Sequence, residues 1–152
     1  MEKIIFETAI GKIYMEFVDG YAKTLYSSDA PITTSPKSPE AKKAEKELGE
    51  FFKGIRKDFT IKYKIEGSDF KKKVLSTLGT ISYGQTVSYE ELAILSGYPK
   101  AVRAVGTVMK HNPLPFILPC HRVIRKTGDV GNYGGGREMK RYLIDMEQCG
   151  RK

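Results

Sequence analysis

The spacing of apolar residues changes near the middle of the chain, at Glu66-Gly67-Ser68. Several segments before this point alternate apolar with polar side chains, which is typical of half-buried strands. After it, apolar residues recur every three or four positions, as on one face of a helix. A length of 152 residues suits one domain, or one domain with a small appended one. We therefore predict an α+β protein with domains over residues 1–66 and 67–152.

The first domain is predicted to be a β-meander followed by a helix and a further strand. These elements are expected in the order 3–10, 12–18, 21–26, 38–54 and 59–65. Asp19-Gly20 is a strong hairpin signal between the second and third strands. Ser38 can cap the helix, with Pro39 in its first turn. We find no constellation of catalytic residues in this domain.

The second domain is predicted to be mostly helical, with helices over 68–79, 88–97, 100–110 and 137–147. Ser88 and Glu91 have the spacing of a capping box, in which each side chain accepts a hydrogen bond from the backbone N–H of the other residue. The last helix carries an apolar stripe formed by Met139, Leu143 and Met146. Glu147 lies at the edge of this stripe, where a carboxylate is unexpected unless it has a partner.

The helices over 88–97 and 100–110 resemble a helix-turn-helix, because both are short and a Gly-containing turn joins them. The alternative is an αα-hairpin that only packs. Small residues on the second helix favour DNA binding, since they let its backbone come close to another surface. They stand beside one arginine, Arg103, and are Ala101, Ala104 and Gly106.

The net charge of +8 is concentrated in the second domain. Residues 1–66 hold 12 Lys/Arg against 11 Asp/Glu, whereas residues 67–152 hold 14 against 7. Such an asymmetry suggests that the second domain meets a polyanion, most simply nucleic acid. The alternative is a solvated basic face that keeps the protein soluble.

Pro119-Cys120-His121-Arg122-Val123 is the stretch in which chemistry is most visible. It follows an apolar run bounded by prolines, which predicts a buried or half-buried strand. The cationic neighbours would favour the thiolate of Cys120, which is the nucleophilic form. The alternative is an inert core cysteine beside a chance histidine. On a strand, Cys120 and His121 would point to opposite faces, which disfavours direct proton transfer between them.

The chain holds two cysteines, Cys120 and Cys149, and two histidines, His111 and His121. These numbers provide neither a disulfide framework nor a zinc-ligand spacing, so no metal site is expected. No apolar run has the length of a signal-peptide core or a membrane span. We therefore expect a cytoplasmic protein.

The second domain resembles the O6-alkylguanine-DNA alkyltransferase family, the methylated-DNA–protein-cysteine methyltransferases, over residues 70–147. The matching motifs are Arg103-Ala104-Val105-Gly106, the stretch from Asn112-Pro113 to Pro119-Cys120-His121-Arg122-Val123, and Gly131-Asn132-Tyr133 with the helix that ends at Glu147. Residues 1–66 match in outline only. The resemblance implies a ribonuclease-H-like N-terminal domain and a C-terminal domain with a winged-helix-like helix-turn-helix.

The resemblance implies a DNA repair protein that flips O6-alkylguanine out of double-stranded DNA and transfers the alkyl group irreversibly to Cys120. His121 would take the thiol proton through a water, and Glu147 would orient and charge His121. Tyr89 matches the phenol that contacts the flipped base and donates a proton to the departing guanine. No cofactor is implied, because the DNA itself is the alkyl donor, and a monomer is expected.

Further residues are implied to bind the DNA and the flipped base. Arg103 matches the finger that fills the gap left by the flipped nucleotide. In this family the second helix enters the minor groove, which admits only small side chains beside the finger, here Ala101, Ala104 and Gly106. The base pocket is implied to be lined by Asn112, Val123, Tyr133 and Gly134. Asn112 would also bridge the recognition helix to the active-site strand, and Gly134 replaces a serine of several relatives.

Two other functions stay open at this point. The first is a helix-turn-helix lesion sensor or regulator that flips alkylguanine without repairing it. Related alkyltransferase-like proteins replace the acceptor cysteine, so the presence of Cys120 argues against this function. The second is a cysteine hydrolase that uses Cys120, His121 and Glu147, and it would need a bridging water between the first two.

Overall fold

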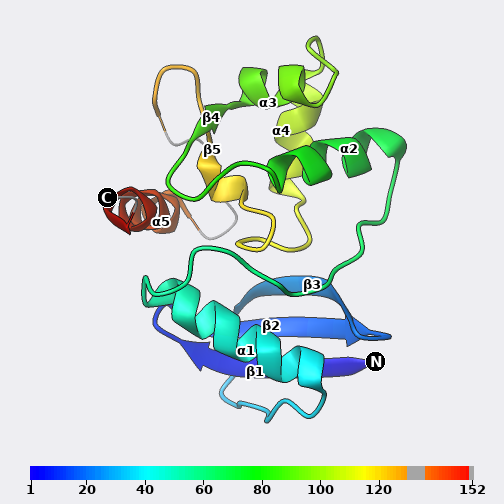
Figure 1. The fold of residues 1–152 in the computed structure, drawn as a ribbon, viewed down its shortest axis with the longest axis vertical. Helices are drawn as coiled ribbons and strands as arrows, with labels where there is room; N and C mark the ends of the chain where they lie inside the picture. The colour runs from blue at the N-terminus through cyan, green and yellow to red at the C-terminus, as the bar shows by residue number, and fades with distance from the viewer. Residues whose placement is uncertain (130–135, 151–152) are drawn as a thin grey trace. The chain divides into compact units, whose positions relative to one another are not determined.

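The computed structural model describes residues 1–129 and 136–150. The chain forms two compact units, Met1–Ile65 and Glu66–Lys152 (Figure 1). Mixed strands and helices confirm an α+β protein. Within the described ranges, no helix combines the length and apolarity that a membrane span requires.

The first unit is built on a three-stranded antiparallel sheet with the order β1-β2-β3. Its strands are β1 (Glu2–Thr8), β2 (Gly11–Val18) and β3 (Tyr21–Ser28). The predicted meander is therefore confirmed. Asp19 and Gly20 both have positive φ, 51° and 83°, as a type I′ hairpin turn requires. Alternate residues are buried in β1 and β2, and β3 buries Ala22 and Leu25 opposite a register shift between Glu16 and Phe17, so one face of the sheet forms the core.

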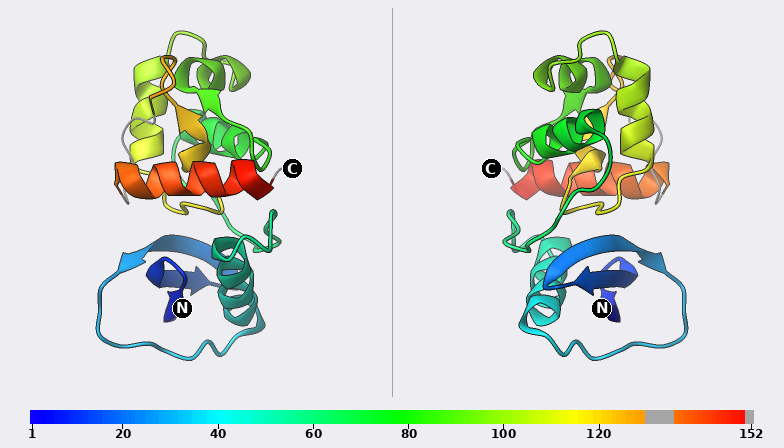
Figure 2. Two further views of the ribbon diagram at one scale, coloured as in Figure 1. Left: turned by 90° about the vertical axis from the view of Figure 1, so that its left-hand side faces the viewer. Right: turned by 90° about the vertical axis from the view of Figure 1, so that its right-hand side faces the viewer.

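Helix α1 (Pro39–Phe52) crosses one face of this sheet and covers it (Figures 1 and 2). Ser38 accepts a hydrogen bond from the Ala41 backbone N–H at 3.1 Å, which confirms the predicted cap. The helix buries five apolar side chains, Ala41, Ala44, Leu48, Phe51 and Phe52. Their spacing of three or four residues places them on one face of the helix.

The predicted fourth strand over residues 59–65 is wrong. Burial does alternate there, with Ile61 inside, but the segment makes only an isolated bridge between Ala22 and Tyr63. The backbone N–H of Thr60 donates to the buried carboxylate of Glu47 at 2.7 Å. The segment meets β3 at this one bridge, where the Ala22 N–H donates to the Lys62 carbonyl at 2.8 Å, so the alternation reports burial but not a continuous ladder.

The second unit holds the predicted helices. They are α2 (Asp69–Leu78), α3 (Tyr89–Leu95), α4 (Val102–Lys110) and α5 (Arg137–Gly150). The Ser88–Glu91 capping box is present, with N–H···O distances of 3.0 and 3.1 Å. Helix α3 packs against both α2 and α4, so the two short helices of the predicted helix-turn-helix lie in contact.

The predicted strand around Cys120 is wrong. The chain turns back on itself, with the Leu118 N–H bonded to the Leu114 carbonyl at 2.8 Å. Pro119 (φ −79°, ψ 69°) is the centre of an inverse γ-turn, which places the Cys120 N–H 2.8 Å from the Leu118 carbonyl. Cys120–Arg122 is a 3₁₀ turn, η1. Prolines donate no backbone hydrogen bond, so the run that they bound pairs poorly in a ladder.

The extended part is short: β5 (Val123–Ile124) pairs in parallel with β4 (Val87–Ser88). The pair joins the residues just after Cys120 to the start of α3. Because Cys120 and His121 lie in a 3₁₀ turn, the strand-based expectation that they point to opposite faces does not apply.

The predicted apolar stripe of α5 is partly wrong. The buried residues are Lys140, Leu143, Ile144 and Glu147, whereas Met139 and Met146 are half-buried. The spacing of the buried set is that of a core-facing helix, but two of its members are ionisable. The prediction failed because it counted only apolar side chains as buried.

Candidate active site

A cavity of about 1180 Å³ lies beside Cys120. Four residues that the sequence placed in different roles line it together: Cys120, Tyr89, Arg103 and Gly106. They come from η1, the first turn of α3, and α4. Ligand sites are typically concave spaces of about 300–1,000 Å³, so the cavity has room for an extruded nucleobase.

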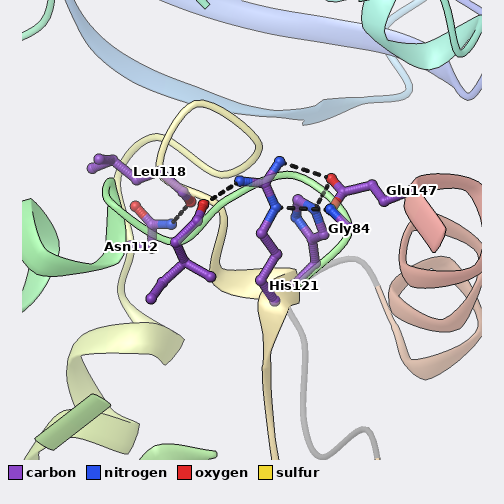
Figure 3. Close-up of polar contacts among 7 residues, drawn as sticks. Gly84, Asn112, Leu118, His121 and Glu147 are labelled. Carbon is purple, nitrogen blue, oxygen red and sulfur yellow. Dashed lines mark hydrogen bonds and ion pairs between the residues drawn. The ribbon is translucent and has the colours of Figure 1, made fainter. Parts of the chain in front are cut away.

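Asn112 fixes the turn that carries Cys120. Its side-chain nitrogen donates to the Leu118 carbonyl at 2.7 Å (Figure 3). Its side-chain oxygen accepts the Leu114 N–H at 3.0 Å. The same Leu118 carbonyl accepts the Cys120 N–H. One amide thus ties the end of α4 to the start of η1, which is the geometry of the predicted bridge.

Glu147 lies at the centre of a buried polar cluster. Its Oε2 atom is 2.6 Å from His121 Nε2, and the two side chains point toward one another in Figure 3. Arg122 donates from Nε to Oε1 at 2.8 Å and from Nη2 to Oε2 at 3.0 Å. The Gly84 backbone N–H adds a bond to Oε1 at 3.3 Å. The carboxylate that was unexpected in the sequence therefore accepts bonds at both oxygens.

These partners decide the ionisation of Glu147 and His121. Burial alone would raise the pKa of Glu147, but hydrogen bonds from His121 and Arg122 outweigh it and lower the pKa to about 2. Burial lowers the pKa of His121 although Glu147 acts against it, so the imidazole is neutral at pH 7. Because an ionised carboxylate only accepts, Nε2 carries the proton and Nδ1 keeps a basic lone pair.

Cys120 rests as a thiol. Its side chain is 7% exposed, and burial raises its pKa, although the Asn112 amide and the charge of Lys140 act against this. The prediction that the cationic neighbours His121 and Arg122 favour the thiolate is therefore wrong for the resting protein. Arg122 is bound to Glu147, and His121 is neutral, so neither supplies a free positive charge to the sulfur. A base must remove the proton during reaction.

Lys140 is a site residue that the sequence did not reveal. It is completely buried, and its Nζ lies 5.7 Å from the centroid of the Tyr89 ring. Burial lowers its pKa to about 8, while Cys120 acts to raise it. One signal was available in the sequence. Lys140 lies seven residues before Glu147, and two apolar residues lie between them at helical spacing, which places Lys140 on the same face of the helix.

The phenol of Tyr89 stays protonated. Its pKa is raised by burial first and by Cys120 second, while Arg125 acts to lower it. A neutral phenol that shares a cavity with Cys120 can donate a proton to a bound group.

Other predicted residues lie near this cavity or outside the described part. Ala101 precedes the first turn of α4, and Ala104 is exposed on that helix; neither lines the cavity. Val123 is fully buried in β5. Tyr133 and Gly134 lie outside the described residues.

Comparison with known proteins gives a consistent assignment. The family described as 6-O-methylguanine DNA methyltransferase, DNA binding domain, matches residues 69–149. A methylated-DNA–protein-cysteine methyltransferase of Mycolicibacterium paratuberculosis is 43% identical over 105 residues, which cover 69% of this chain and 64% of that relative, a little under two thirds of its length. The protein of the same name from Methanosarcina acetivorans is 35% identical over 94% of this chain and 96% of its own length.

Solved structures extend the similarity to both units. The Mycobacterium tuberculosis OGT in complex with DNA superposes with a TM-score of 0.86 and 34% identity, covering 96% of this chain and 92% of that one. An O6-methylguanine DNA methyltransferase from Methanococcus jannaschii gives 0.68 and 29%, covering 97% and 90%. On these matches the chain belongs to the family of methylated-DNA–protein-cysteine methyltransferases.

Proposed function

We propose that the protein repairs double-stranded DNA by moving an alkyl group from O6 of a flipped guanine to Sγ of Cys120. An S–C bond forms as the C–O6 bond breaks, and the thioether has no evident route back, so each molecule acts once. The observation that carries this proposal is the cavity shared by Cys120 and Tyr89. His121, the residue after Cys120, is buried and bonded to the buried Glu147.

The thiol proton must leave as the sulfur attacks. His121 is the base, and a bridging water carries the proton from Sγ to the lone pair of Nδ1. Glu147 holds the Nε2 proton and stabilises the imidazolium that forms. Arg122 keeps Glu147 ionised and in place through two hydrogen bonds. It acts through Glu147 and is thus a positioning residue.

The guanine leaves as an anion unless it gains a proton. Tyr89 supplies that proton, since its phenol is neutral and faces the same cavity as Cys120. The guanine then leaves as a neutral base. The tyrosinate takes up a proton from solvent and the His121 imidazolium releases one to solvent, so the protons balance.

Helix α4 is proposed to enter the minor groove. Arg103 is exposed on it and lines the cavity, as a finger that fills the gap behind an extruded base would need to. Its neighbours Ala101, Ala104 and Gly106 are small, which suits close approach to DNA. The M. tuberculosis relative is described as a complex with DNA.

The remaining assignments follow the same proposal. Residues 1–66 are assigned to a ribonuclease-H-like domain, supported by the strand–strand–strand–helix order. Residues 67–152 are assigned to a DNA-binding and acceptor domain with a winged-helix-like helix-turn-helix, supported by the packing of α2, α3 and α4. The base pocket is assigned to Asn112, Val123, Tyr133 and Gly134.

Transfer of label from DNA tests the proposal. Duplex DNA with radiolabelled O6-methylguanine is incubated with the native protein and with Cys120→Ala. We expect up to one label per native chain and none on Cys120→Ala, which should still bind the duplex. Repeated turnover, or binding without transfer by the native protein, would overturn the proposal and favour a hydrolase or a lesion sensor.

A further inference from the structure

The cavity beside Cys120 is strongly basic. Four of its described lining residues are cationic, namely Arg103, Lys110, Arg125 and Arg137, and none of the described lining residues is acidic. Like charges that converge on one concave surface repel each other, so such an arrangement is stabilised when an anion binds there.

Arg125 differs from Arg137 because, like Arg103 and Lys110, it has no carboxylate partner among the described residues. In the described part of the chain no Asp or Glu oxygen lies within ion-pair distance of its guanidinium, whereas Arg137 binds Asp129 at 2.5 Å. The adjacent Lys126 lies 3.8 Å from Glu90 and does not line the cavity. Arg125 therefore lines the cavity without a carboxylate partner, whereas Lys126 lies outside the cavity and near a carboxylate.

The backbone presents Arg125 from a fixed position. It follows β5 directly, its N–H donates to the Asp129 carbonyl at 2.8 Å, and its own carbonyl accepts the Gly128 N–H at 2.8 Å. The side chain is exposed, but its charge reaches inward, since it acts to lower the pKa values of both Tyr89 and Lys140. Arg125 therefore lies at the rim of the cavity, above the groups that would meet the base.

We propose that Arg125 binds a backbone phosphate of the flipped nucleotide, an inference that rests on the proposed function. A nucleotide that enters with its base toward Cys120 and Tyr89 leaves its phosphates at the rim. A guanidinium matches a phosphate with two parallel hydrogen bonds, which makes arginine well suited to this contact. Being exposed at the rim, Arg125 is placed for the phosphate and not for the reacting O6 and sulfur atoms.

The test compares Arg125→Ala with Lys126→Ala, which removes an equal charge from the next residue. Each variant reacts with a duplex that carries O6-methylguanine and with free O6-benzylguanine, which has no phosphate. For Arg125→Ala we expect roughly ten-fold weaker duplex binding and a ratio of duplex to free-base rate that falls by a similar factor, as for loss of one charged hydrogen-bond pair. The slope of log affinity against log salt should fall by about 1.

Lys126→Ala should change the rate ratio by less than about two-fold, because an exposed paired lysine contributes little. Arg125→Lys keeps the charge without the planar fork and should fall between native and Arg125→Ala. If Arg125→Ala behaves like Lys126→Ala, the phosphate contact is wrong. An equal loss of transfer rate on the duplex and on free O6-benzylguanine would also overturn the phosphate contact. Arg125 would then act on the leaving group or the fold.

The native protein separates this inference from the proposed function. Transfer to native Cys120 from both substrates, with an unchanged ratio in Arg125→Ala, rejects the phosphate contact alone. Absence of transfer from either substrate in the native protein rejects the proposed function.

Discussion

The two units of the chain fill their interiors with different kinds of side chain. In Met1–Ile65 the described buried set is apolar apart from Glu47, whereas Glu66–Lys152 buries His121, Arg122, Lys140 and Glu147. Burying charge costs free energy, and even paired buried ions rarely stabilise more than apolar residues of the same size. The interior of the first unit is thus explained by folding alone. That of the second is explained by a task that needs titratable groups.

Removing one buried carboxylate from each unit should give the largest difference in folding stability and alkyl-transfer rate between the two units. Glu147→Gln leaves Arg122 without its ionised partner, and breaking a buried pair in this way costs about 3–5 kcal/mol of folding stability. It should also slow alkyl transfer roughly 100-fold or more, since His121 loses the group that stabilises its protonated form. Thermal unfolding and single-turnover transfer measure the two effects.

Glu47→Gln is the matched control in the first unit. It weakens the bond to the Thr60 N–H and should cost about 1–3 kcal/mol, with less than a two-fold change in transfer. A transfer loss in Glu47→Gln equal to that in Glu147→Gln would erase the contrast between the units.

The loss of folding stability at acid pH provides a second test of Glu147. Its folded pKa of about 2 lies below the ordinary value of 4.5, so the stability that it adds is present above pH 4.5 and is lost as pH falls toward 2. Glu147→Gln should therefore flatten the loss of stability across that window.

The comparison also shows which features a sequence can reveal. Local signals were sufficient where neighbours in the chain supply the partner, as in the Asp19-Gly20 turn and the Ser38 and Ser88 caps. The strand predicted over 59–65 failed because Thr60 bonds to the Glu47 side chain and the segment meets β3 only at an isolated bridge, and no local pattern announces either contact. The strand predicted around Cys120 failed because Pro119 turns the chain.

The residues of the candidate site also fall into those that the sequence predicted and those that it did not. The residues matched by the family motif, such as Cys120, Tyr89 and Arg103, do meet in one cavity. Lys140 and the clamp of Arg122 on Glu147 were not predicted. Charged side chains on a helix count as solvent-facing unless their partners are known, and these partners come from distant segments.

Lys140 provides a smaller test in an alkaline pH window, where stability should again rise with pH. Its folded pKa of about 8 lies below the ordinary 10.5 because burial disfavours the charged form. The unfolded chain binds more protons between these values, so native stability should rise with pH from about 8 to 10.5.

Lys140→Met removes the ammonium and keeps the stem. We expect this variant to lose the rise and to be more stable than the native protein at pH 7, with a lower transfer rate because Cys120 loses a nearby positive charge. Denaturant titrations at pH 7, 8.5 and 10 give the comparison. If the stability of Lys140→Met rises by the same amount between about pH 8 and 10.5, a group other than Lys140 causes the rise.

The smallest expected difference between the two units concerns their serine caps, Ser38 and Ser88, each of which precedes a helix in a different unit. Ser38 caps α1 and Ser88 caps α3 with the same type of bond, so Ser38→Ala and Ser88→Ala should each cost about 1 kcal/mol of stability. Only Ser88 adjoins a residue of the cavity, Tyr89, which is the first residue of α3. A frayed first turn displaces the phenol, so Ser88→Ala should slow alkyl transfer severalfold and Ser38→Ala should leave it unchanged. Equal transfer rates at equal loss of stability would mean that β4 and β5 hold Tyr89 without the cap.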